Sequence, residues 1–215
     1  MYTKANQQFG LTKRTCYFVN DIKRKRALYL SLIRSQFEHC SPIWRPTTQT
    51  MISKFEAFQK KCIKWILAEE HFHYHTQETY LVKCRQANVL PLVKRFDFND
   101  LNLFYRVVYG LVPLKLPTYL KFFDGQSRLR SCHLDTLSLV SDVLPRTSSL
   151  HTINSSSSLN KSFFYRTHFL WNKLSFELRD IKSFSSFRNK LEKILWSESR
   201  LEASPSEPID DLDDF

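Results

Sequence analysis

The chain has 215 residues, of which 42% are hydrophobic and 14% aromatic, and this excludes an intrinsically disordered protein. It contains only 3 glycines, which argues against a β-barrel or a glycine-rich phosphate loop and favours helices. The 32 Lys and Arg residues against 21 Asp and Glu residues give a net charge of +11, which favours a polyanionic partner.

The positive charge is concentrated towards the N-terminus. Residues 1–64 contain 13 basic and 3 acidic side chains, whereas residues 203–215 contain five acids and no base. Such a field attracts nucleic acid, because each neutralised phosphate releases a counterion. The alternative is a solvated basic surface with no dedicated ligand.

Several features predict an intracellular protein, cytoplasmic and/or nuclear. No stretch of 18 apolar residues is present, so no membrane-spanning helix is predicted. The first residues, MYTKANQQFGLTKRT, lack the apolar run of a signal peptide. The five cysteines are widely spaced and form no CxxC pair, which is typical of reduced thiols.

Two amphipathic helices are predicted between residues 20 and 66. Asn20 or Asp21 caps the first helix, whose apolar face comprises Leu28, Tyr29, Leu32, Ile33, Phe37 and Cys40. Pro42 ends it, and Thr47 or Thr48 opens the second helix. The second apolar face comprises Ile52, Phe55, Cys62, Ile63 and Ile66. The short connection predicts antiparallel packing of the two helices.

Further helices are predicted along the rest of the chain. A short one covers 80–86. Pro91 suits the first turn of a longer one, which ends near Gly110, a suitable residue for a helix C-terminus. The apolar positions of this longer helix include Leu92, Phe96, Leu101, Phe104, Tyr105 and Val108. TYLKFF, residues 118–123, is predicted to form one short helix, and some β pairing is expected around 128–143. The aromatic block FFYRTHFLWNKL and a helix after Ser183, with Phe187, Leu191, Ile194 and Leu195 on its face, complete the pattern.

These elements predict a mainly α protein: an antiparallel helical bundle, then a loop-rich segment, then a smaller C-terminal helical part. The predicted boundaries are 1–125 for the bundle, 126–160 for a Ser-rich loop region, 161–197 for the C-terminal helices and 198–215 for an acidic disordered tail.

No self-contained catalytic centre, metal site or cofactor site is predicted. The HFHYH segment, residues 71–75, offers imidazoles but lacks a paired Cys or acidic ligand at motif spacing. The acidic pairs at 210–211 and 213–214 lack a rigid strand that could fix a metal's geometry. The sequence contains no phosphate-binding P-loop and no nucleophile–base motif.

Basic residues interleaved with aromatic ones are the remaining candidate site. We expect contacts between phosphates and the cations of the first two helices. The candidate nucleic-acid-binding residues are Lys23, Arg24, Lys25, Arg26, Arg34, Lys54, Lys60, Lys61 and Lys64.

Two blocks of the chain, LYLSLIRSQFEHCSPIW at 28–44 and ISKFEAFQKKCIKWI at 52–66, resemble a pattern in non-LTR (LINE-type, jockey-like) retrotransposon reverse transcriptases. The residues that match in type and spacing are Leu28, Tyr29, Ser31, Leu32, Arg34, Ser35, Glu38, Cys40, Ser41, Trp44, Glu56 and Gln59. His39 stands where the family usually has Tyr. FGLTKRT, FNDLNLFYRVVYGLV and WNKLSFELRDIKSFSSFRNKL are similar to further family segments, in the family's order.

The resemblance implies the thumb and post-thumb region of such an RNA-directed DNA polymerase. Its role would be sequence-nonspecific binding of template–primer RNA and DNA, in support of palm and fingers domains that this chain lacks. The parent family uses Mg²⁺ at a catalytic Asp-Asp turn that is not present here, so no independent polymerase activity is expected. The alternative is a non-catalytic helical protein-interaction module from a decayed or co-opted element.

Overall fold

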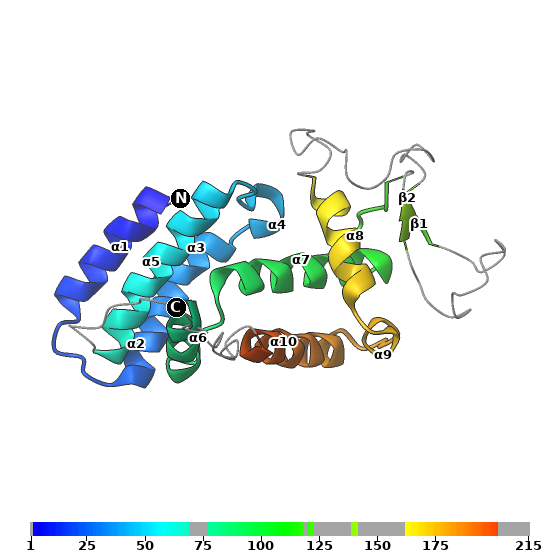
Figure 1. Cartoon of the computed structure of the whole chain (residues 1–215). Coiled ribbons are helices and arrows are strands. Elements are labelled where there is room, and N and C mark those ends of the chain that lie inside the picture. The colour runs from blue at the N-terminus through cyan, green and yellow to red at the C-terminus, as the bar shows by residue number, and fades with distance from the viewer. Residues whose placement is uncertain (1, 69–76, 118–119, 123–138, 142–161, 202–215) are drawn as a thin grey trace, which may run out of the picture. The chain divides into compact units, whose positions relative to one another are not determined.

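A computed structural model describes residues 2–68, 77–117, 120–122, 139–141 and 162–201. The described residues are mainly helical, which confirms the predicted fold class (Figure 1). The HFHYH segment lies outside these residues, as do most of the predicted loop region 126–160 and of the predicted tail 198–215. Within the loop region, residues 139–141 form a strand, as the β pairing expected around 128–143 predicts. The prediction of disorder is wrong for residues 198–201, which are helical.

Contacts divide the chain into two compact units, each assembled from separate stretches of sequence. Unit 1 comprises 1–39, 49–94 and 194–215, and unit 2 comprises 40–48 and 95–193. This division differs from the predicted boundaries, because it falls within two long helices rather than at residues 125 and 160.

Unit 1 contains the N-terminal helices. Their bounds are α1 Tyr2–Thr15, α2 Ile22–Leu28, the π-helix η1 Tyr29–Arg34, α3 Ser35–Glu38, α5 Gln49–Leu67 and α6 Gln77–Gln86. The first residues of α7, Leu92–Val108, and the last residues of α10, Phe184–Leu201, also belong to it. α1 was not predicted as a helix from the sequence.

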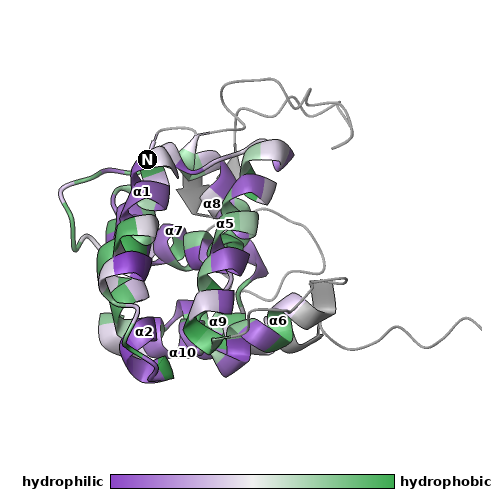
Figure 2. Cartoon of the chain, turned by 90° about the vertical axis from the view of Figure 1, so that its left-hand side faces the viewer, coloured by the Kyte–Doolittle hydropathy of each residue, from purple (hydrophilic) through white to green (hydrophobic). Residues whose placement is uncertain are grey.

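The helices α1, α2–α3 and α5 pack side by side around an aromatic core (Figure 1). Phe58 is fully buried, and its ring lies 5.7, 5.8 and 5.4 Å from those of Tyr2, Phe9 and Phe37. Phe37 near the end of α3 contacts Phe55 near the start of α5, so these helices run antiparallel as predicted. Hydrophobic and hydrophilic residues are mixed along the helices, as expected of amphipathic helices that pack on one face (Figure 2).

The first predicted helix contains an unexpected π-helical turn. Asp21 accepts a hydrogen bond from the Lys23 amide and caps the helix start, as predicted. A π-helix has more residues per turn than the 3.6 of an α-helix. Residues four or five apart therefore share a side, so that Tyr29 and Ile33 are buried whereas Leu32 is 40% exposed. The expectation that Leu32 joins the buried face is wrong for this reason.

Cys40 also departs from the predicted apolar face. It is exposed and lies beyond the end of α3, where its backbone has a positive φ of 52°. The chain turns there before Pro42 enters the short helix α4, Ser41–Trp44.

Unit 2 contains α4, the rest of α7 and α10, and four smaller elements. These are β1 Leu120–Phe122, β2 Leu139–Ser141, α8 Phe163–Lys173 and α9 Phe176–Arg179. β1 and β2 form an antiparallel pair, with Lys121 opposite Val140. The short helix predicted over residues 118–123 is therefore wrong, because pairing with a distant segment holds its centre extended.

The core of unit 2 is also aromatic. The Tyr105 ring stacks on Phe187 at 4.3 Å, and Trp171 lies 5.3 Å from Phe104. Tyr105 donates a hydrogen bond to the Ile181 carbonyl oxygen at 2.6 Å, which satisfies its hydroxyl. The predicted apolar faces of α7 and α10 are largely confirmed, although Val108 and Ile194 are only partly buried.

A buried carboxylate organises the polar contacts of unit 2. Asp100 is fully buried, and it accepts hydrogen bonds from Arg45 at 2.8 Å and from Arg166 at 2.9 Å. Arg45 also pairs with Asp97 at 2.7 Å, and Arg166 donates to the Pro42 carbonyl oxygen. These charges hold α4 and α8 against α7.

Asp100→Asn should lower the free energy of unfolding by about 3–5 kcal/mol, because it removes the charge of the buried carboxylate that both Arg45 and Arg166 contact. Asp97→Asn is the matched control, because this carboxylate also pairs with Arg45 but its side chain is 15% exposed against 1% for Asp100. Urea denaturation gives the free energy of unfolding of both variants, and we expect the smaller loss for Asp97→Asn. An equal loss in the two variants would contradict the assignment of Asp100 as the organising carboxylate.

Two glycines provide a test of backbone conformation. Gly110 has φ +64° and ends α7 in a Schellman motif, in which the Leu111 amide donates to the Arg106 carbonyl oxygen at 2.7 Å. Gly10 lies within α1, and an added Cβ meets no atom within 4 Å at either glycine.

Gly110→Ala should destabilise the protein by about 1–2 kcal/mol, the cost of a left-handed conformation for an L-residue. Gly10→Ala should stabilise it by roughly 0.5–1 kcal/mol, because alanine loses less backbone entropy in a helix. Denaturant titration gives the change in the free energy of unfolding for both variants. Changes of the same sign would contradict the backbone conformations described for the two glycines.

Candidate nucleic-acid interface

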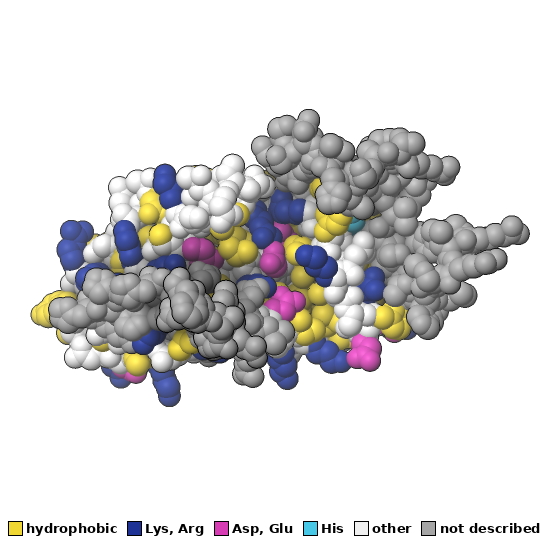
Figure 3. Space-filling model, viewed as in Figure 1, with side chains coloured by type: hydrophobic (Ala, Val, Ile, Leu, Met, Phe, Trp, Pro, Cys, Tyr) yellow, Lys and Arg dark blue, Asp and Glu magenta, His cyan; other side chains and the backbone are white. Residues whose placement is uncertain are grey.

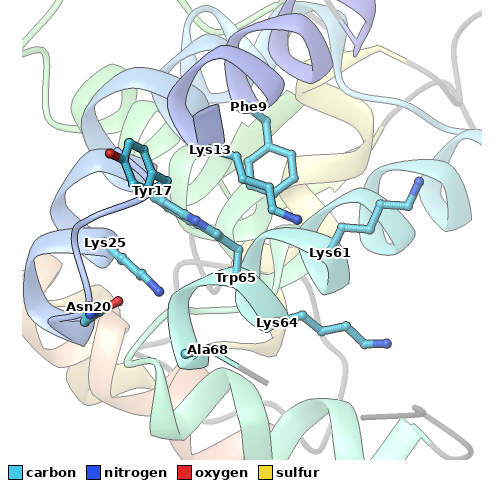
Figure 4. Close-up of a pocket in the computed structure, with 9 residues that line it drawn as sticks. All are labelled: Phe9, Lys13, Tyr17, Asn20, Lys25, Lys61, Lys64, Trp65 and Ala68. Carbon is cyan, nitrogen blue, oxygen red and sulfur yellow. The ribbon is translucent and has the colours of Figure 1, made fainter. Parts of the chain in front are cut away.

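A cavity of about 700 Å³ lies in unit 1, between α1, α2 and α5 (Figure 4). Four lysines and three aromatic residues make up most of its lining. The lining residues are Phe9, Lys13, Tyr17, Asn20, Lys25, Lys61, Lys64, Trp65 and Ala68. We call this cavity the lysine pocket.

Helical spacing brings these residues to one place. Phe9 and Lys13 are four residues apart on α1, and Tyr17 follows four residues later, just beyond the helix end. On α5, Lys61 and Trp65 are four residues apart and Lys64 lies between them. Because α1 packs along α5, the two sets converge on one pocket.

The aromatic part of the pocket is anchored to the core. Phe9 contacts Phe58 edge-on at 5.8 Å and Trp65 edge-on at 5.9 Å. The Lys25 Nζ lies 5.7 Å from the centre of the Trp65 ring, within the range of a cation–π interaction. Lys25 is only 6% exposed, so its aliphatic stem contributes to packing while its ammonium group faces the indole.

The charged side chains in the described lining of the pocket are all positive. Among the described residues, its lining includes four lysines and no acidic side chain. Figure 4 shows the Lys61 and Lys64 side chains extending from the same side of α5. A lysine ammonium group is a compact cation with three donors, suited to contact with phosphate oxygens. The arrangement is therefore suited to an anion.

The three acids of residues 1–64 are held by partners of their own outside this lining. Asp21 caps α2 and lies 3.7 Å from Arg24. Glu38 pairs with Arg34 at 2.5 Å. Glu56 accepts hydrogen bonds from the Tyr80 hydroxyl and the Val93 amide. None of these carboxylates lines the lysine pocket.

The structure brings together three of the nine predicted nucleic-acid-binding residues, namely Lys25, Lys61 and Lys64. The others do not line the pocket. Lys23 and Lys54 are exposed on their helices, Arg24 is beside Asp21, and the Arg26 Nε donates to the Asn88 carbonyl oxygen at 3.0 Å. The Lys60 Nζ lies 4.9 Å from the Tyr80 ring centre.

Arg34 differs most from expectation, because it does not project into solvent. It is 8% exposed and pairs with Glu38. It follows Tyr29 by five residues, and the π turn carries positions at this spacing to the buried side. A phosphate would have to displace Glu38 to reach Arg34, so Arg34 is not part of the candidate interface.

Six residues of the pocket were not predicted as site residues from the sequence: Phe9, Lys13, Tyr17, Asn20, Trp65 and Ala68. The available signal was the four-residue spacing of Phe9, Lys13 and Tyr17, which repeats along one side of a helix. Their convergence with α5 depends on tertiary packing and does not follow from spacing alone.

Other kinds of site have little support in the described part of the chain. No group of three or more His, Cys, Asp or Glu residues there could hold a metal ion. Within the same residues, no helix is long and apolar enough to cross a bilayer. Lys and Arg side chains are spread over the face in Figure 3, whereas Asp and Glu are few.

Comparisons of the chain with protein-family models, curated proteins and solved structures gave no match. The function is therefore inferred from the lysine pocket and from the sequence resemblance.

The buried carboxylate of Glu56 should make stability depend on pH. Burial raises the pKa of Glu56 above its ordinary value, although hydrogen bonds from Tyr80 and Val93 act in the opposite direction. The folded state therefore binds this proton more tightly than the unfolded state, and its contribution to stability is lost as the pH rises through the folded-state pKa.

Glu56→Gln should remove the loss of stability at rising pH, because a neutral amide has no proton to release. The Gln side-chain oxygen can still accept the hydrogen bond from the Val93 amide. Urea denaturation between about pH 4 and pH 8 should show a flatter stability profile than the unmodified chain. Glu177→Gln, at an exposed position on α9, controls for the removal of one negative charge. An unchanged profile for Glu56→Gln would contradict the assignment.

Proposed function

We propose that the chain binds the phosphate backbone of nucleic acid, without sequence preference, at the lysine pocket of unit 1. The observation that carries the proposal is that Lys13, Lys61 and Lys64, together with the largely buried Lys25, line one pocket from three helices, with no acidic side chain in the described lining. Lysines contact backbone phosphates, which are the same for every base sequence.

The resemblance to non-LTR retrotransposon reverse transcriptases supports the same function. It suggests a role as the non-catalytic thumb and post-thumb region that holds template–primer RNA and DNA for a polymerase centre in other domains. Tyr29, Arg34, Glu56 and Gln59, which carry part of the resemblance, are mostly buried and belong to the scaffold of unit 1. They would hold the helices that present the lysines.

The proposal requires that the position of the charge matters, and not only its amount. Lys61→Glu combined with Lys64→Glu reverses two charges in the pocket. Lys190→Glu combined with Lys193→Glu is a matched control, because these exposed lysines have the same spacing on α10 in unit 2. Both double variants change the net charge by the same amount.

Fluorescence anisotropy with a labelled, mixed-sequence RNA–DNA hybrid at about 50 mM salt should detect binding by the unmodified chain, where phosphate contacts are strongest. The pocket variant should weaken binding about tenfold or more. It should also flatten the dependence on salt, by roughly 0.9 in the logarithmic slope for each phosphate that is no longer neutralised. The control should change binding much less.

Two results would overturn the proposal. One is an equal loss of affinity in both double variants, which would indicate attraction by net charge alone. The other is the absence of salt-sensitive binding by the unmodified chain. A strong preference between two hybrids of different sequence would contradict a backbone-based mechanism.

A further inference from the structure

We infer that the lysine pocket takes an unpaired nucleotide of a single strand, with its base against Tyr17 and its neighbouring phosphates against the lysines. This inference rests on the proposed function and specifies its ligand. The reason is that the pocket contains an exposed aromatic ring, that of Tyr17, in addition to its lysines.

Tyr17 is the aromatic residue of the pocket that is open to a ligand. Its side chain is 79% exposed, although it lines the cavity. Phe9 and Trp65 are partly buried by contacts with each other, with Phe58 and with Lys25. The Tyr17 ring instead contacts the Phe18 ring, with 5.7 Å between the ring centres and 89° between the ring planes, and most of the Tyr17 side chain stays exposed.

Phe18 is also exposed, at 68%, so two neighbouring aromatic rings remain in solvent beside the cationic pocket. Exposed aromatic rings do not contribute to the core of unit 1, and a site that holds only phosphates does not need them. Nucleic-acid bases offer flat faces for such rings, and cations around the rings hold the connecting backbone.

The pairing state of the ligand follows from the chemistry of stacking. Within a duplex, the faces of each base are covered by its neighbours, and a side chain on the outside reaches mainly phosphates and sugars. Unpaired bases can be turned outward and stacked on an aromatic side chain. The combination of Tyr17 with Lys13, Lys61 and Lys64 therefore favours a single strand over a duplex.

The size of the cavity agrees with this assignment. Its volume of about 700 Å³ lies within the range of pockets that enclose a small organic ligand, about 300–1,000 Å³. A nucleotide is a ligand of this class. Backbone contacts along a duplex need a charged surface but no concave pocket.

The test compares three kinds of labelled probe of equal length: a single strand, the corresponding RNA–DNA hybrid, and a single strand with abasic residues. Each is prepared with one mixed sequence, and the single strand is prepared as both RNA and DNA. The protein variants are Tyr17→Ala and Tyr17→Phe. Phe176→Ala, which removes an exposed aromatic ring in unit 2, is the control.

Tyr17→Ala should weaken binding of the single strand about tenfold, the scale of one base stack, and leave the hybrid and the abasic strand unchanged. Tyr17→Phe should retain the affinity of the unmodified chain, because it keeps the ring. The control should change none of the three affinities. Because Tyr17 is exposed, its replacement should not perturb folding.

The inference is overturned if Tyr17→Ala leaves single-strand binding unchanged, or if it weakens binding of all three probes equally. It is also overturned if Tyr17→Phe binds as weakly as Tyr17→Ala. Such results, together with a loss of binding in the Lys61/Lys64 double variant, would refute the stacked base and leave the proposed backbone binding in place. Failure of that double variant to alter binding would instead refute the proposed function.

Discussion

The packing of the buried face of α5 is the interaction on which unit 1 depends. Phe58 contacts aromatic rings from α1 and α3, and Phe55, Cys62 and Ile63 extend the same buried face. Full burial of one such side chain contributes roughly 1.5–3 kcal/mol, so a face of this size dominates the weaker surface contacts. By fixing three helices in register, this face also determines which side of α5 remains outside the core.

The same packing separates the charges of unit 1. The acids of residues 1–64 cap a helix, pair with a buried arginine, or accept hydrogen bonds near the start of α7. The lysines of the pocket project from helix surfaces that meet no carboxylate in the described lining. A local cationic site therefore arises from the placement of a few acids as much as from the number of lysines. Screening by salt reduces such a field over about 8–10 Å, which confines its effect to close ligands.

The sequence predicted most of the amphipathic helices, although not α1, because their periodicity depends on local spacing. The burial of Phe55, Cys62 and Ile63 and the C-terminal Gly110 of α7 followed from this pattern. Local spacing could not predict features that depend on distant partners. The extended conformation of β1 depends on β2, and the lysine pocket depends on the packing of α1 along α5. The burial of Arg34 depends on one π-helical turn, for which the sequence gives no periodic signal.

The composition of unit 1 from distant stretches of sequence has a consequence for biosynthesis. Arg85 donates a hydrogen bond to the Ser199 carbonyl oxygen at 2.9 Å, and Lys94 pairs with Glu198 at 3.0 Å. Most of unit 1 is synthesised early, but a nascent chain cannot complete this unit until the ribosome has translated α10 to its end. Until then, the surface that receives α10 remains open to chaperones and to other chains.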